Sequence, residues 1–146
     1  MTVRVSAAAY AVLLAAGACR GALASPQQDY VLHCMGCHGP AAQGVPGKVP
    51  PLANALSRFM RTPAGRDYVL RVPGAANSAL SDVQLAAVLN WLAVTYDQRT
   101  AADRPAPFTS DEVSRVRHTP LPSVLAARSA VVRELAATGP APPAQY

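Results

Sequence analysis

Two cysteines and a histidine stand close together near the start of the chain, where residues 33–40 read HCMGCHGP. Cys34 and Cys37 are separated by two residues, and His38 follows the second cysteine directly. This C-x-x-C-H spacing is typical of covalent haem attachment, in which both thiols add to vinyl groups and the histidine coordinates the iron. Residues three and four apart share one face of a helix, so a short helix would bring these side chains together. The motif therefore predicts one covalently bound haem c.

Other chemistries of paired cysteines fit the chain less well. A thioredoxin-like redox pair would follow a β-strand in an α/β pattern, and no strand pattern of useful length is present. A zinc site usually takes four ligands, and beyond the motif the chain after residue 24 offers only two more histidines, His33 and His118. A disulfide that closes so small a loop would contribute little stability. We therefore favour haem attachment.

The first residues, 1–24, have the pattern of a secretory signal peptide. Arg4 supplies a basic start, residues 7–18 form an apolar stretch, and residues 22–24 read Ala-Leu-Ala, an A-x-A cleavage site. The stretch is shorter than the roughly 20 residues that a membrane span requires. Lipid attachment at Cys19 is the alternative, but the leucine that usually stands three residues before such a cysteine is missing. We expect cleavage, export to the periplasm and no membrane span in the mature chain.

Helix signals divide the rest of the chain. Each is a serine or threonine N-cap followed by proline at the first helical position or by Glu or Gln at the third. These caps are Ser25, Thr62, Ser81 and Thr109. The helix after Ser81 is the strongest, because apolar residues recur every three or four positions as far as Tyr96. A run at residues 52–60 is ambiguous. The pattern predicts an all-α fold with long loops.

The C-terminal part of the chain differs in composition. Residues 122–137 are predicted to form an amphipathic helix. Its apolar positions are Val124, Leu125, Val131, Val132 and Leu135. Residues 138–146 are rich in proline and alanine and are predicted to be a flexible tail. The predicted organisation is thus a domain at 25–98, a helical extension at 99–137 and the tail.

The order of these features resembles that of an exported bacterial monohaem class I cytochrome c. It reads C-x-x-C-H-G, a Gly-rich loop, P-x-L, a short helix and an L-S-D-x-x-L helix with an aromatic residue, over residues 26–96. The resemblance implies a small helical domain around a covalent haem, in which the Tyr30 helix packs on the helix of residues 85–92. Pro50 and Leu52 match the P-x-L element, whose proline carbonyl typically accepts the ring N–H of the proximal histidine.

One position departs from the pattern of that family. A methionine before a proline usually provides the second axial ligand, but this chain has Val72 before Pro73, and valine cannot bind iron. Met60 is our first candidate, since thioether ligation raises the potential and suits an electron carrier. His118 would have to fold back from the extension, and His33 lies beside the attachment motif. The fourth alternative is an open iron position.

Charge and motifs limit the other classes of function. The chain has 13 basic and 8 acidic residues, a net charge of +5, and loss of Arg4 and Arg20 with the signal would lower it by two. No Lys/Arg cluster with interleaved aromatic residues is present, which argues against nucleic-acid binding. No Ser–His constellation, buried carboxylate pair or phosphate-binding loop is apparent, so no separate catalytic site is expected. Arginines at positions 58, 61, 66 and 71 form either a basic rim for an acidic partner or a solvated face.

These observations predict an electron-transfer protein rather than an enzyme. It would carry single electrons between protein partners such as a dehydrogenase, an oxidase or another cytochrome, with a dehydrogenase as its donor. The first alternative is a haem protein whose open sixth position binds a small ligand. The second is a haem subunit of a dehydrogenase complex, docked through residues 99–137.

Overall fold

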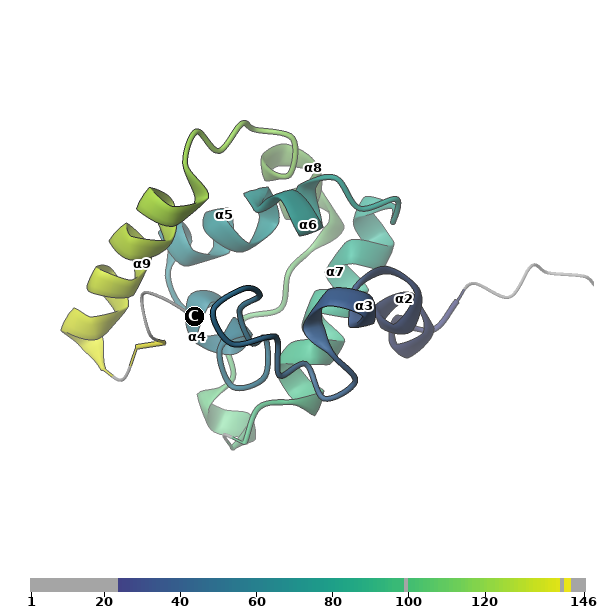
Figure 1. Ribbon diagram of the computed structural model, residues 1–146, viewed down its shortest axis with the longest axis horizontal. Coiled ribbons are helices and arrows are strands. Elements are labelled where there is room, and N and C mark those ends of the chain that lie inside the picture. The colour runs from purple at the N-terminus through teal and green to yellow at the C-terminus, as the bar shows by residue number, and fades with distance from the viewer. Residues whose placement is uncertain (1–23, 99, 140, 143–146) are drawn as a thin grey trace, which may run out of the picture.

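The computed structural model describes residues 24–98, 100–139 and 141–142. The predicted signal peptide lies outside these residues except for Ala24, and so does Cys19. Within the described residues the structure is helical, and its extended pairing is one isolated bridge between Val45 and Val49. The all-α prediction is confirmed. In chain order the helices are α2 (Pro26–His33), α3 (Met35–His38), α4 (Leu56–Phe59), α5 (Pro63–Arg71), α6 (Pro73–Ala76), α7 (Asp82–Thr95), the 3₁₀ turn η2 (Ala101–Asp103), α8 (Ser110–Val116) and α9 (Val124–Thr138) (Figure 1).

The predicted N-caps begin helices as expected. At Ser25 and Ser81 the hydroxyl accepts the N–H of the third helical residue, a glutamine, whose side-chain oxygen in turn accepts the backbone N–H of the cap residue. Thr62 and Thr109 accept the corresponding N–H groups of α5 and α8. Each cap satisfies backbone donors that have no partner within the helix. A fifth cap, Ser123, begins α9.

Two details concern the helices α6 and α9. Helix α5 stops at Arg71, and Pro73 occupies the first position of the short helix α6. Proline is favoured there, since its missing N–H would have no helical partner. Leu125 is 62% exposed, although the apolar pattern predicts it on the buried face of α9. Val124, the preceding residue, packs against the core. Successive side chains on a helix point about 100° apart, so Leu125 points away from the core.

Helix α2 packs against α7. Tyr30 of α2 is 1% exposed, and its ring centroid lies 5.7 Å from Trp91 and 6.3 Å from Tyr96. The Tyr30 hydroxyl also donates to the carbonyl of Gly39 at 2.5 Å, just after α3. The expected packing of these two helices is confirmed, and it fixes α3 and its C-x-x-C-H residues against the core.

The residues after 98 pack on the same core. Helix α8 packs against α7 and α5, while α9 lies along α5 and α4 (Figure 1). Val113 of α8 and Val131, Val132 and Leu135 of α9 are buried in one cluster with residues of α2, α5 and α7. The extension therefore shares a hydrophobic core with the rest of the protein.

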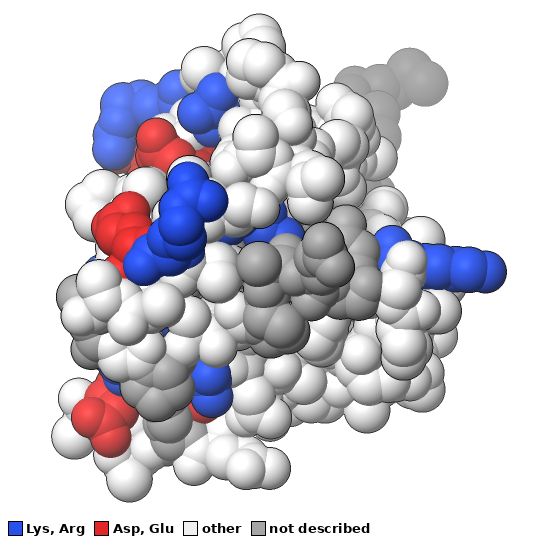
Figure 2. Space-filling view, turned by 60° about the vertical axis from the view of Figure 1, so that its left-hand side comes forward, with Lys and Arg blue, Asp and Glu red and all other residues white. Residues whose placement is uncertain are grey.

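Arginines of α5 and the turn before it attach this extension. Arg61 donates to the carbonyl of Asp103 at 2.9 Å. Arg66 forms two 2.6 Å hydrogen bonds with the carboxylate of Glu112, and Arg71 donates to the carbonyls of residues 119 and 120. These three side chains bind the protein's own C-terminal part, although Arg61 is also exposed. On the face of Figure 2, basic and acidic side chains are interspersed.

Candidate haem-binding site

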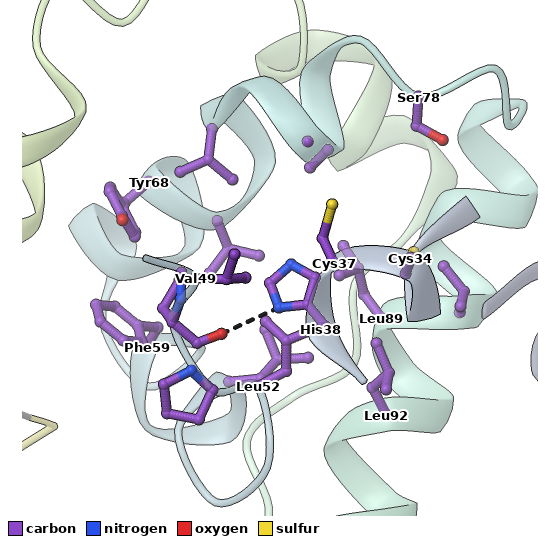
Figure 3. A pocket seen from close by; sticks show the side chains of 18 of the residues that line it. Cys34, Cys37, His38, Val49, Leu52, Phe59, Tyr68, Ser78, Leu89 and Leu92 are labelled. Carbon is purple, nitrogen blue, oxygen red and sulfur yellow. Dashed lines mark hydrogen bonds between the residues drawn. The ribbon is translucent and has the colours of Figure 1, made fainter. Parts of the chain in front are cut away.

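A largely apolar cavity of about 340 Å³ lies beside α3. Its walls come from α2, α3, α4, α5, α6, α7 and α9 and from the loop of residues 48–52. Leucine, valine, phenylalanine and proline side chains make up most of the lining (Figure 3). Such a cavity suits a mostly apolar ligand that presents few polar atoms to the protein.

Cys34 and Cys37 both line this cavity and are free thiols. Cys34 is half-buried at the junction of α2 and α3, whereas Cys37 is exposed. Burial raises the pKa of the Cys34 thiol, and the nearby Asp29 and Cys37 raise it further. Because both cysteines are free thiols, they are not joined as a disulfide. Both line the cavity and are placed to bond to the same group in it.

His38 is held at the cavity by a single hydrogen bond. Its Nδ1–H donates to the carbonyl oxygen of Pro50, with 3.0 Å between nitrogen and oxygen. Burial lowers the pKa of the imidazole, and the bond to Pro50 opposes that change in part. The hydrogen bond to Pro50 and the lowered pKa both suit a metal ligand, because a neutral ring whose Nδ1–H donates to a carbonyl has its Nε2 lone pair free. In Figure 3 the other ring nitrogen points away from Pro50, toward α5 and α6.

No protein-family model matches the chain. Curated proteins that it resembles include two named cytochrome c-552, both from Thermus thermophilus. The first is 32% identical over 118 residues, which cover 66% of this chain and 80% of the relative. The second is 32% identical over 102 residues, which cover 58% of this chain and 78% of the relative. The chain belongs to the c-type cytochromes.

The residues of this cytochrome fit the haem c that the family implies. Two free thiols, a neutral imidazole with one nitrogen free and an apolar cavity are the groups that such a cofactor requires. Pro50 and Leu52 of the P-x-L element both line the cavity. Cys34, Cys37 and His38 would hold the group, which supplies one-electron redox chemistry when bound.

The candidates for the second axial ligand are placed differently. Met60 is 3% exposed within the hydrophobic core and is not among the residues that line the cavity. His118 lies in a separate hollow with Arg71 and Arg117. His33 lines the cavity but belongs to α2, next to Cys34, while Val72 lines it from the segment between α5 and α6. Of the described side chains, neither Met60 nor His118 reaches the cavity.

Two cavity residues come from the extension and were missed in the sequence. Val124 and Arg128 of α9 both line the cavity, and Arg128 is only 2% exposed. The signal was present, because Arg128 lies four residues after Val124 and four before Val132, in the middle of the apolar face. A charged residue at such a position either ends a hydrophobic surface or faces a polar group.

In the part of the chain that the structure describes, no three or more His, Cys, Asp or Glu side chains gather into a possible metal site. None of the described helices is long and apolar enough to span a membrane.

Proposed function

We propose that this cytochrome is an exported carrier of single electrons that holds one covalent haem c. Cys34 and Cys37 form the thioether bonds, and His38 is the proximal iron ligand. The bond between His38 Nδ1 and the Pro50 carbonyl, beside two unpaired thiols at an apolar cavity, carries this proposal. The Pro50 carbonyl fixes the imidazole tautomer and raises its basicity toward iron.

The rest of the cavity serves the same role. Leu52, Leu89 and Leu92 provide apolar walls near the histidine (Figure 3). A buried, apolar setting excludes water and sets the reduction potential together with the axial ligands. The chain's part in electron transfer is therefore to hold the cofactor in a fixed, largely dry position.

Haem attachment is tested by expressing the full chain with a c-type haem maturation system. We expect haem to stay with the polypeptide after acid-acetone extraction, and one haem to be found per chain by mass spectrometry. Cys34→Ala or Cys37→Ala should leave a single thioether, and the double variant should lose all covalent haem. His118→Ala, which alters a residue outside the cavity, is the matched control. Extraction of all haem from the unchanged protein would refute the proposal.

Export and partners are tested separately. Periplasmic fractions should contain a mature protein that begins at Ser25, as N-terminal sequencing would show. The proposed partners are redox proteins, with a dehydrogenase as electron donor. Reduction of the purified cytochrome by a periplasmic dehydrogenase fraction, in proportion to added dehydrogenase substrate, would support this donor. Reduction that does not depend on such a substrate would count against it.

A second candidate function is binding of a small neutral ligand, such as carbon monoxide or nitric oxide, at an open iron face. The observation that favours it is the composition of the wall toward which the free nitrogen of His38 points. The cavity residues that α5, α6 and the position between them contribute include Val69, Val72 and Ala75, none of which can coordinate iron, while Met60 lies elsewhere in the core. Ligation by Met60 stays a prediction that would require the chain around α4 to rearrange.

Absorption spectra separate the two functions. If Met60 coordinates the iron, the ferric protein shows a methionine–iron charge-transfer band that disappears in Met60→Leu, a substitution of similar volume. If the face is open, the ferric spectrum is high-spin, ferrous protein binds carbon monoxide rapidly, and Met60→Leu changes neither. A low-spin spectrum without carbon monoxide binding, unchanged in Met60→Leu, would exclude both arrangements.

A further inference from the structure

The short helix α6 lies between the haem cavity and the hollow that contains His118. Gly74 and Ala75 of this helix line the cavity, whereas Pro73 and Ala76 line the hollow, which has a volume of about 240 Å³. Residues three apart share one face of a helix, so α6 turns one face to each space. The helix is only four residues long, too short for its own hydrogen bonds to fix its position. Contacts with other segments must therefore hold it.

A buried arginine of the extension supplies these contacts. Arg117, at the C-terminal end of α8, is only 4% exposed. Its guanidinium donates to three backbone carbonyls between α6 and α7, those of Ala76 at 3.2 Å, Leu80 at 2.7 Å and Ser78. It also donates to Oδ1 of Asp82, the first residue of α7, at 3.1 Å. One side chain thus ties the end of α6 to the start of α7.

Arg117 is itself held by packed helices. Val113, one turn earlier in α8, is fully buried in the core, and α8 packs against α7 and α5. The guanidinium therefore extends from a fixed part of the molecule. The segment that it binds, residues 77–81, lies between helices and has no helical hydrogen bonds of its own to resist movement. Hydrogen bonds from a charged donor are among the stronger ones in proteins, so these should dominate the position of the segment.

We propose that Arg117 is a positioning residue that limits the size of the ligands able to reach the iron from the side opposite His38. The free nitrogen of His38 points toward α5 and α6, so α6 forms part of the wall that such a ligand meets (Figure 3). While Arg117 holds the carbonyls of Ala76 and Ser78, this wall stays in place. The inference rests on the covalent haem proposed above.

The hollow gives the wall a direction in which to move. Arg117 lines the hollow together with Pro73 and Ala76, so its removal both breaks the contacts of α6 and enlarges the space beside that helix. A shift of α6 into this space would widen the haem cavity without compressing the core. A ligand of two atoms needs less of that room than a five-membered ring does. Loss of Arg117 should therefore favour the larger ligand.

The test titrates ferric holoproteins of the full chain with imidazole and with cyanide. Both bind ferric haem, and both meet the same wall whether the iron position is open or occupied by a protein ligand. Arg117→Met should raise the affinity for imidazole at least about tenfold, because movement of the wall then breaks no hydrogen bond to a charged group. The affinity for cyanide should change much less. Hydrogen exchange of the amides of residues 74–80 should accelerate in the same variant.

Two controls separate this role from a general loosening of the extension. Arg66→Met removes the attachment of the extension to α5 through Glu112, and Arg115→Met changes an exposed arginine of α8. Neither should change the selectivity between imidazole and cyanide. Arg117→Lys keeps the charge but has fewer donors and lacks the planar fork, so its affinity for imidazole should be intermediate.

The outcomes distinguish this inference from the proposed function. If the unchanged protein carries no covalent haem, the proposed function fails and this inference with it. If haem is attached, and Arg117→Met binds imidazole no more tightly than the unchanged protein, the inference is overturned while haem attachment stands. An equal gain for cyanide, or an equal gain in Arg66→Met, would overturn it as well. Should Arg117→Met not fold, Arg117→Lys decides, and an unchanged affinity for imidazole in that variant overturns the inference.

Discussion

Replacement of Arg66 by methionine tests how firmly the extension is held. The guanidinium forms two 2.6 Å hydrogen bonds with the Glu112 carboxylate and lies 4.3 Å from the centroid of the Phe108 ring. It also donates to the carbonyls of Ala106 and Pro107, at 2.7 and 3.1 Å. One side chain of α5 thus binds four residues of the segment that leads into α8.

The expected loss follows from these contacts. A hydrogen bond to a charged group contributes about 1.5–3 kcal/mol, and a cation–π contact about 0.5–1 kcal/mol. The side chains of Arg66 and Glu112 are 16% and 20% exposed, so water replaces part of what is lost. Because the contacts are also not additive, we expect Arg66→Met to lower the free energy of unfolding by about 3 kcal/mol. Glu112→Gln keeps a neutral acceptor and should lower it by about 1–2 kcal/mol.

Urea unfolding followed by far-UV circular dichroism gives these differences, and hydrogen exchange of α8 amides shows where the structure opens. The double variant should show a coupling energy of about 1–3 kcal/mol between the two positions. Arg104→Met, at an exposed arginine, is the control. A loss within about 0.5 kcal/mol for Arg66→Met, the range of ordinary surface substitutions, would refute the reasoning.

The pH dependence of stability gives a second check on the same pair. Hydrogen bonding to Arg66 holds the pKa of Glu112 below its usual value. A lowered carboxyl pKa contributes stability that is fully present above the unfolded-state pKa of about 4.3 and is lost as the pH falls through the folded-state value. The difference in stability between the unchanged protein and Arg66→Met should therefore be constant near neutral pH and shrink in acid. If this stability difference grew as the pH falls, Arg66 would not be what lowers the pKa of Glu112. Three further substitutions test the local packing. Gly65→Ala should lower the free energy of unfolding by about 3 kcal/mol in urea titrations, because the new Cβ would collide with the Phe59 carbonyl oxygen. Gly36→Ala, whose Cβ would meet nothing within 4 Å, should leave stability nearly unchanged, and an equal loss in both would contradict this account. Tyr30→Phe removes the 2.5 Å hydrogen bond to the Gly39 carbonyl and should lower the free energy of unfolding by about 1 kcal/mol, seen as a lower melting temperature. No change in melting temperature would show that water replaces this bond.

The local features of this fold were predictable from sequence because they depend on neighbouring residues. The caps at Ser25, Thr62, Ser81 and Thr109 use hydroxyls and N–H groups three residues apart, so the chain signals them directly. The contact between His38 and Pro50 came from resemblance to a family, since twelve residues separate the two and no local rule joins them.

Features that depend on distant segments were not predictable in this way. Whether Arg66 faces solvent or the extension is decided by the path of residues 106–112, which no periodicity encodes. Met60 belongs to an apolar run, and the sequence does not distinguish a methionine in the core from one at the cavity. Arg128 was the exception, because a charge on an apolar helix face is visible as an inconsistency in the pattern.

The cavity also has a consequence for the rate of folding. Its walls join Cys34, near the first helix, to Arg128 in the last, so completing it closes a loop of roughly ninety residues. Contacts between such distant segments slow folding relative to that of a bundle with local contacts. If α9 docks after the transition state of folding, substitutions at buried positions of this helix, such as Val131 or Leu135, will chiefly accelerate unfolding and leave the folding rate nearly unchanged. The lifetime of the folded protein would then depend on its last helix, although the attachment motif lies near its first.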